Sequence, residues 1–306
     1  MHGAVRQPKA ASPSWRRFAR SGDASYGFIA PALAIYVILI FIPILSGVGY
    51  AFTNWDGLRQ KVQYIGFANF ERMINDLQVR SAVATTLLIA FALVIAKVGL
   101  GLVLALIVDS NLKSRYYLRL AFFTPVVMTP VIVSYVWKYI FSNDGAFNRI
   151  LQVFGFEGLQ WLGDPTLALW SVIIVTSWQS VGLSMVIFVA GLQSVPREMQ
   201  EAALIDGASW GQRLRYVTIP MLAPAITICV VIALIHGLRF FDQIYALTRG
   251  GPGYATETLS TMIYRISFQF GEFSYGSAVA LAFSIFVAVI VLPVMYGLRK
   301  REINHG

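Results

Sequence analysis

The sequence has few of the residues that support disulfide, metal or phosphate chemistry. It contains one cysteine, Cys229, and three histidines that lie far apart, His2, His236 and His305. One cysteine excludes an intrachain disulfide, and the scattered histidines give little support to a metal site. No Gly-x-x-x-x-Gly-Lys motif occurs, so the usual loop for ATP phosphates is missing. We therefore expect no catalytic residue, no metal and no cofactor bound by this chain.

Charged residues are also scarce. They make up 13% of the 306 residues, whereas hydrophobic residues make up 57%, and the mean hydropathy is +0.65. These values lie outside the usual range of soluble domains. The net charge of +9 is dispersed over short polar segments rather than gathered on one soluble face, which argues against nucleic acid as a partner. The composition predicts a protein of the lipid membrane.

Long apolar runs recur along the chain. Each reaches the roughly 20 residues that a helix needs to cross about 30 Å of hydrocarbon. The first run is longer than the core of a signal peptide and ends without a convincing cleavage site, so we interpret it as a retained anchor. The predicted fold class is all-α and polytopic, with six transmembrane helices. The runs cover residues 27–50, 82–108, 117–141, 166–190, 221–245 and 275–297.

Basic residues are concentrated in alternate polar segments. The N-terminus, the second and fourth loops and the C-terminal tail hold most of the lysines and arginines. The positive-inside rule then predicts a multi-pass protein with both termini and the fourth loop in the cytoplasm. The predicted organisation is a flexible basic arm (1–26), a first transmembrane helix with an outer loop (27–81), a five-helix core (82–297) and a basic tail (298–306).

Two outer loops show helical periodicity. Helices there would either fill gaps between the spans or form part of a surface for an external partner, and periodicity does not distinguish these roles. The apolar positions are Phe67, Phe70, Ile74 and Leu77 in one loop and Phe147, Ile150, Leu151 and Phe154 in the other.

The loop between the fourth and fifth runs is charged and structured. Ser194 is a predicted helix cap, and Pro196 suits the first turn of a helix that Gly207 ends. Ser209 and Gln212 have the spacing of a capping box, which predicts a second helix. A structured, charged loop at the membrane face suggests docking of another protein, although a short amphipathic helix also fits packing at the interface.

This loop resembles the signature of the integral-membrane permeases of bacterial ABC importers. In that signature a Glu-Ala-Ala triplet, a glycine and an Ile-x-Leu-Pro close form helices that enter a groove on a cytoplasmic ATPase. Here the triplet begins at Glu201, and the close has the conservative departures Val217 and Ile219. By resemblance, the ATPase-coupling residues are Glu198, Glu201, Ala202, Ala203, Asp206, Gly207 and Pro220.

Other segments resemble the carbohydrate branch of these permeases, particularly the maltose- and glycerol-phosphate-type first permease. They are residues 64–70, 137–138, 240–252 and 256–259, and the resemblance covers nearly the whole chain from about residue 27. It implies a subunit of a sugar importer in the bacterial plasma membrane. The implied partners are a second, homologous permease, a cytoplasmic ABC ATPase dimer that uses ATP and Mg, and an extracytoplasmic sugar-binding protein.

Polar and aromatic residues within the fourth and fifth runs are candidates for a sugar path. Sugars are held by hydrogen bonds and aromatic faces, and polar groups are costly against lipid. By resemblance, the maltose-type permease lines its sugar site from the same stretches. Trp178 also fits helix packing, and His236 also fits an interhelical hydrogen bond. The candidates are Trp178, Gln179, Ser180, His236, Gly237 and Phe240.

Three of the charged residues inside these apolar runs could have a functional role. Arg239 and Asp242 are three residues apart, a spacing that allows an ion pair on a helix. Lys97 lies in the middle of the second run, with no carboxylate within four residues. Its role stays unassigned, because a water-filled path, a contact with the partner permease and snorkelling all fit.

Two other functions fit parts of the sequence. A secondary transporter also has buried charges among its membrane spans, but would follow an ion gradient rather than ATP. An intramembrane serine protease would use Ser184 and His236, yet the segment around Ser184 is a poor match to Gly-x-Ser-Gly. The resemblance favours the importer and a sugar substrate, with amino acids, phosphate and peptides as alternative substrates.

Overall fold

The structure is a computed structural model that describes residues 24–58, 61–110 and 114–305. These residues are mainly helical and contain no β-strand, so the predicted all-α class is confirmed. Most of the predicted N-terminal arm, residues 1–23, lies outside the described residues.

Within the described ranges, four helices are long and apolar enough to cross a membrane. The first combines α2 (Ala24–Tyr36), the π-helical turn η1 (Val37–Phe41) and α3 (Ile42–Tyr50). The others are α5 (Leu77–Asp109), α9 (Pro165–Gln193) and α16 (Phe273–His305). Two bent helix pairs raise the number of candidate spans to as many as six if each pair counts as one.

The third predicted span, residues 117–141, is bent rather than continuous. Helices α6 (Arg115–Val127) and α7 (Pro130–Ile140) meet at 104°. Pro130 lacks a backbone N–H, and a proline disfavours helical backbone at the residue before it. Thr129 is accordingly extended, with φ −68° and ψ 141°. The prediction of one uninterrupted helix is therefore corrected here.

The fifth predicted span, residues 221–245, is also interrupted. Helix α13 (Ala223–Leu238) ends inside this range, and α14 (Asp242–Leu247) begins after a short non-helical turn. At its other end α13 meets the segment Trp210–Met221 at 69°. The turn after Leu238 places three residues outside regular helix, in the middle of an apolar stretch.

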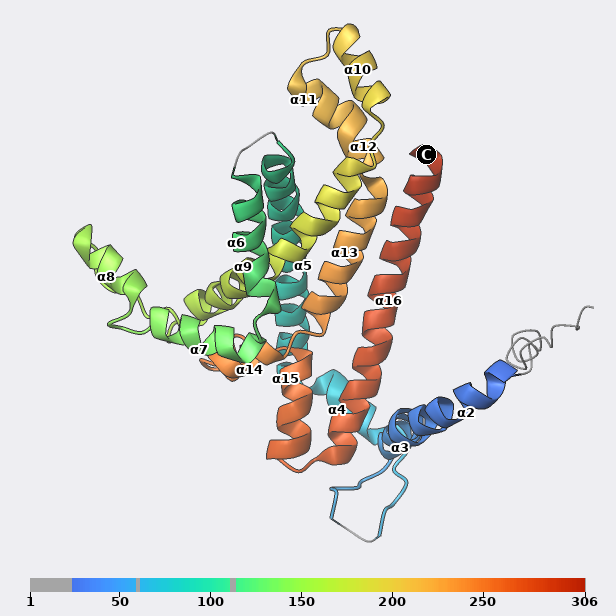
Figure 1. Cartoon of the computed structure of the whole chain (residues 1–306). Helices are drawn as coiled ribbons and strands as arrows, with labels where there is room; N and C mark the ends of the chain where they lie inside the picture. Colours follow the sequence, from blue (N-terminus) through green and yellow to red (C-terminus); the bar gives the residue numbers. More distant parts are fainter. Residues whose placement is uncertain (1–23, 59–60, 111–113, 306) are drawn as a thin grey trace, which may run out of the picture.

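Helix α5 packs against α9 and α13 and forms the centre of the bundle. Gly101 allows α5 and α9 to approach closely, because a Cβ atom there would lie 2.6 Å from the Cβ of Ser184. Small residues at such contacts are typical of helix packing in membranes. Figure 1 shows α16 alongside α13, with α10 and α11 at the same end of the molecule as the C-terminus.

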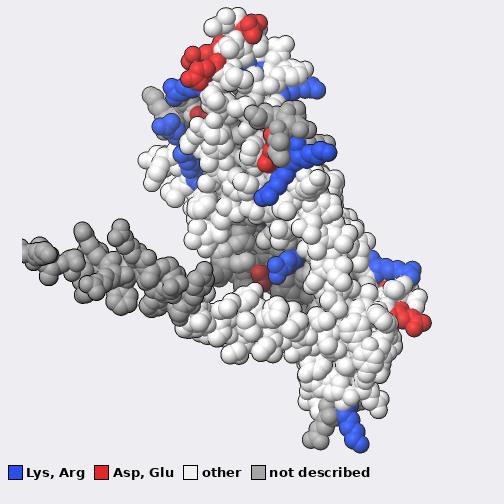
Figure 2. Space-filling view, turned by 90° about the vertical axis from the view of Figure 1, so that its right-hand side faces the viewer, with Lys and Arg blue, Asp and Glu red and all other residues white. Residues whose placement is uncertain are grey.

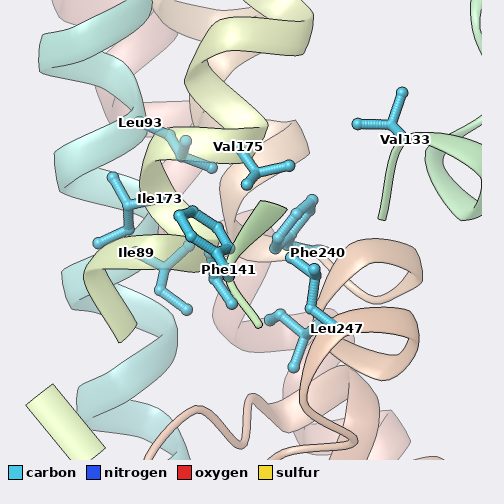
Figure 3. Close-up of a cluster of buried hydrophobic side chains, with 10 residues drawn as sticks. Ile89, Leu93, Val133, Phe141, Ile173, Val175, Phe240 and Leu247 are labelled. Atoms are coloured by element: carbon cyan, nitrogen blue, oxygen red, sulfur yellow. The ribbon is translucent and has the colours of Figure 1, made fainter. Parts of the chain in front are cut away.

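A cluster of buried apolar side chains joins α5 and α9 to α14 (Figure 3). Ile89 and Leu93 come from α5, and Val175 comes from α9. Phe240 and Leu247 approach from the segment that includes α14, and all five side chains are at most 4% exposed. This cluster fixes the interrupted fifth span against the two straight helices.

The periodicity of the outer loops corresponds to real helices. Helix α4 (Ala68–Asn75) packs against α5 and α16, whereas α8 (Ala146–Val153) projects from the side of the molecule (Figure 1). A further short helix, α15 (Leu259–Tyr264), continues into the π-helical turn η3 (Arg265–Gln269) and packs against α16.

Asn148 organises the chain around α8 with five hydrogen bonds. Its Nδ2 donates to the carbonyls of Ser142, Asn143 and Leu159, and its Oδ1 accepts from the Leu159 amide and the Trp161 indole. The side chain is 1% exposed. Its removal would therefore leave several buried polar groups without their partner.

We expect Asn148→Leu to lower the thermal unfolding midpoint of the purified protein in detergent. An unsatisfied buried polar group costs about 1–3 kcal/mol, and leucine satisfies none of the five. Asn143→Ala is the control, since the Asn143 side chain is exposed and only its backbone carbonyl joins the network. Equal midpoints for Asn148→Leu and the wild type would contradict this assignment.

Candidate functional site

The loop between α9 and α13 extends beyond the end of the helix bundle (Figure 1). Its first helix, α10 (Arg197–Ile205), ends at Gly207, which has φ +78°, a conformation that favours glycine. The Gly207 N–H donates to the Leu204 carbonyl at 3.0 Å, and the Ala208 N–H donates to the Ala203 carbonyl at 2.9 Å. These are the two bonds of a Schellman cap. The predicted sharp turn at Gly207 is therefore confirmed.

The second half of the loop consists of α11 (Trp210–Arg213), the π-helical turn η2 (Leu214–Thr218) and α12 (Ile219–Met221). Its predicted capping box is confirmed: the Gln212 N–H donates to Ser209 Oγ at 3.4 Å, and the Ser209 N–H donates to Gln212 Oε1 at 2.7 Å. The arrangement is helix, turn, helix.

Ser194 does not cap α10, contrary to the prediction. Its backbone is still helical, so its hydroxyl points back and donates to the Gly191 carbonyl at 2.7 Å at the end of α9. Pro196 occupies the N-cap position of α10 without a side-chain hydrogen bond. Helix α10 therefore begins without the polar cap that the sequence suggested.

The predicted coupling residues lie mainly on the exposed side of this loop. Apolar side chains are exposed beside them, with Ile205 at 87% and Trp210 at 65%. Figure 2 shows acidic side chains gathered at this end of the molecule. The coupling residues Glu198, Glu201, Ala202, Asp206 and Gly207 are exposed, whereas Ala203 and Pro220 are half-buried. The loop thus presents carboxylates and apolar groups outward together.

A cavity of about 230 Å³ lies where α9 meets the interrupted parts of the third and fifth predicted spans. A neighbouring cavity of about 400 Å³ shares His236, Phe240 and Asp242 with it and adds Arg239 and Phe241. Figure 2 shows a hollow in the molecule with a basic and an acidic side chain in it. The polar side chains that line the smaller cavity are Lys97, Thr176, Gln179, Ser180, His236, Asp242 and Gln243.

Two buried glutamines form one wall of the smaller cavity. Gln179 Nε2 donates to the Met128 carbonyl at 2.7 Å, and Gln243 Nε2 donates to Gln179 Oε1. The Met128 carbonyl lies at the break between α6 and α7, where regular helical bonding stops. Because a backbone carbonyl in a membrane requires a partner, Gln179 stabilises this break. One N–H and one oxygen lone pair of the Gln179 amide are thereby used within the protein, and one of each is left for a ligand.

Lys97 and His236 form an interhelical contact across the cavity. Lys97 Nζ lies 3.2 Å from His236 Nδ1, and the lysine side chain is 4% exposed. The tautomer of His236 decides whether Nδ1 donates or accepts in this contact. The His236 ring also packs against Phe240, with ring centroids 5.4 Å apart. Lys97, which the sequence left unassigned, therefore contacts one of the path candidates.

The structure brings together four of the six path candidates: Gln179, Ser180, His236 and Phe240 all line the smaller cavity. Trp178 instead packs against Trp137, with ring centroids 5.4 Å apart. Gly237 lies at the contact between α13 and α5, where a Cβ atom would be 2.6 Å from Ala90 Cα.

The expected Arg239–Asp242 ion pair does not form. The ion pairs in the described part of the chain are Arg72–Glu272 and Arg265–Glu257. Helix α13 ends at Leu238, so the three-residue spacing no longer places the two side chains on one helical face. Sequence reasoning also missed Gln243, although a lone amide in an apolar run is a signal for a functional or structural role.

The residue range 97–304 matches the family described as "Binding-protein-dependent transport system inner membrane component". The probable starch degradation products transport system permease protein AmyD of Thermoanaerobacterium thermosulfurigenes is 34% identical over 290 residues, which cover 94% of this chain and 98% of that protein. The lactose transport system permease protein LacF of Rhizobium radiobacter is 34% identical over 283 residues, which cover 90% and 94%.

The trehalose/maltose transport system permease protein MalF of Thermococcus litoralis is 31% identical over 284 residues, covering 90% of this chain and 93% of that protein. Among solved structures, a chain of a bacterial ABC transporter that imports the acidic polysaccharide alginate aligns with a TM-score of 0.81 at 24% identity. That alignment covers 94% of this chain and 98% of the other. At this identity the likeness establishes the fold.

We expect Gly237→Ala to destabilise the protein rather than to act on the cavity directly. Overpacking against Ala90 costs about 1–3 kcal/mol, which would lower the unfolding midpoint in detergent. Gly99→Ala in α5 is the matched control, because a Cβ atom there meets nothing within 4 Å. If Gly237→Ala weakened sugar uptake at an unchanged midpoint, Gly237 would be a lining residue instead.

Proposed function

Since the chain belongs to the family of binding-protein-dependent transport system inner membrane components, we propose that its projecting loop couples a sugar cavity to a separate ATPase. The chain is a sugar ABC transporter permease subunit and a multi-pass membrane protein, not an enzyme. The observation that carries the proposal is the exposed loop at one end of the same helices that enclose the polar cavity.

The chemistry of the loop supports docking to an ATPase. Ile205, Trp210 and the small Ala202 are exposed beside Glu198 and Glu201, so an opposing groove would cover apolar surface and supply donors to the carboxylates. Burial of apolar surface is favourable at about 25 cal/mol per Å². In the proposed assembly the cytoplasmic ABC ATPase dimer uses ATP and Mg, and this chain binds neither.

The connection between loop and cavity supports a mechanical role. Helix α12 leads directly into α13, which carries His236, and α9 leads into α10 and carries Gln179. Displacement of the loop would therefore move two walls of the cavity relative to α6 and α7. This is the movement that alternating access requires, with the cavity opening to one side of the membrane at a time.

The proposed sugar contacts are Gln179, Ser180, His236 and Phe240. Their hydroxyl, amide, imidazole and aromatic groups suit a neutral polyol, and all four line one cavity. Trp178 and Gly237 would act through packing. The proposed assembly also includes a second, homologous permease, an extracytoplasmic sugar-binding protein and a cytoplasmic location for both termini.

We expect Glu201→Lys and Gly207→Val to reduce ATP-dependent sugar uptake to background. The first reverses a charge on the docking surface, and the second forces a branched residue into φ +78°. Glu157→Lys, at another exposed acid, and Gly211→Ala, where nothing lies within 4 Å, are the matched controls. Uptake in proteoliposomes and co-purification of the ATPase are the measurements. Uptake that survives both substitutions and follows an ion gradient would overturn the proposed function.

We expect His236→Ala to raise the sugar concentration for half-maximal uptake about tenfold, the effect of losing one hydrogen bond and one ring contact. Lys97→Met should give part of this effect, because the imidazole loses its contact with Lys97 Nζ. Trp178→Ala, outside the cavity lining, is the control and should leave this concentration within about twofold. The reverse pattern would place the sugar at Trp178.

A further inference from the structure

A continuous row of aromatic rings connects the larger cavity with the opposite end of the molecule from α10. Neighbouring ring centroids along the row are 4.2 to 5.9 Å apart. We call these side chains the aromatic row. In spatial order its members are Phe241, Tyr245, Tyr264, Phe268, Phe273, Trp55 and Tyr50.

Two helical turns build the inner half of the row. Phe241 and Tyr245 are four residues apart at the start of α14, and Tyr264 and Phe268 are four residues apart across α15 and η3. Residues at this spacing share one face of a helix. The hydroxyl of Thr258, which caps α15, donates to the Phe240 carbonyl at 3.0 Å and holds the two segments together.

The row begins at the cavity itself. Phe241 lines the larger cavity together with His236, Phe240 and Asp242. Six of the seven rings are half-buried, and Phe268 is 67% exposed. Each of these residues therefore keeps part of its surface exposed, while Phe241 stacks on Tyr245 and Tyr50 stacks on Trp55.

The surface around the row differs from a lipid-facing surface. Between residues 239 and 273 the exposed large hydrophobic side chains are all aromatic: Tyr254, Phe268 and Phe270. By contrast, α16 exposes the aliphatic Ile285, Val289 and Leu292. The polar side chains of Arg239, Asp242 and Gln269 are exposed beside the row. Such groups are costly against hydrocarbon, which argues against a lipid-facing surface here.

Charge along the row is balanced within the protein. Arg265, next to Tyr264, is bound by both carboxylate oxygens of Glu257 at 2.7 and 2.9 Å. At the cavity mouth Arg239 and Asp242 carry one charge of each sign. The row therefore offers no excess charge to attract an ionic ligand, and its recognition groups are ring faces and tyrosine hydroxyls.

Building on the proposed function, we propose that the aromatic row is a binding track for a neutral oligosaccharide on its way to the cavity. The apolar C–H faces of pyranose rings stack on aromatic rings, while their hydroxyls stay in water. Each such contact is weak. The contacts also resemble one another along the row, so a sugar chain can move by one ring without breaking a strong interaction. Because the row extends over many rings, it favours a substrate of several sugar units over a monosaccharide.

The test uses the complete transporter with its binding protein in proteoliposomes. The probes are neutral gluco-, galacto- and xylo-saccharide ladders of one to six units, and ATP-dependent uptake is measured for each length. The variants are Tyr264→Leu and Phe268→Leu, which keep apolar bulk but remove the ring face. Phe91→Leu is the matched control, since Phe91 is 68% exposed on α5 and does not belong to the row.

For the longest transported saccharide we expect the apparent KM to rise about threefold to tenfold in the row variants, the effect of losing one aromatic contact. The disaccharide should change less than about twofold, because it reaches the cavity with fewer ring contacts. Phe268→Trp should restore the wild-type value. The wild type and the variants are measured with the same binding protein, so the chain-length preference of the binding protein is the same in every comparison.

Three outcomes would overturn the proposal: a loss that is equal for every chain length, no loss for any length, or wild-type transport confined to mono- and disaccharides. An equal loss would indicate that the row packs against a partner subunit. Each of these outcomes leaves the proposed function intact, because the wild type still transports sugar. Absence of any ATP-dependent sugar uptake by the wild type would instead contradict the proposed function.

Discussion

A buried amide network connects the parts of the protein that cannot be regular helix. Gln179 on the straight helix α9 binds the Met128 carbonyl at the break between α6 and α7, and Gln243 on α14 binds Gln179 in turn. Regular helical bonding stops at Met128, and Gln179 supplies a partner for its carbonyl. The network therefore permits the bends, and the bends create the cavity.

Two helices connect the cavity with the projecting loop. Helix α13 carries His236 near one end and joins α12 at the other, while α9 carries Gln179 and leads into α10. These helices are stiff because their backbone bonds are internal and their small residues pack closely, as at Gly101 and Gly237. In the proposed function, a displacement at the loop would therefore move the cavity walls that these helices carry.

The cavity and the aromatic row suit two different tasks in the proposed transport cycle. The cavity has directional groups, such as His236 in contact with Lys97, which suit recognition of particular hydroxyls. The row has ring faces in contact with one another, which suit many similar and weaker contacts. In this interpretation the row supplies length preference, and the cavity holds the unit that is about to cross.

Local patterns in the sequence determined the all-α membrane class, the turn at Gly207, the Ser209 capping box and the outer helices. They also indicated Gln179, Ser180, His236 and Phe240, because a polar or aromatic residue inside an apolar run can be recognised without knowing its neighbours in the fold. Pro130 also predicts the bend before it. The hydropathy of residues 117–141 does not show this bend, because it is an average over many residues. The cap at Ser194 was wrong because Ser194 is the C-cap of α9, and its hydroxyl donates back to the Gly191 carbonyl.

Only the tertiary structure decided which of these residues meet. Lys97 and His236 are 139 residues apart in sequence, and Gln179 and Gln243 are 64 apart. Their contacts depend on how α5, α9 and α13 pack and where the helices break, whereas sequence spacing reports neighbours only within one continuous helix. That is why Arg239 and Asp242 did not pair, and why rings as far apart in sequence as Tyr50 and Phe273 belong to one row.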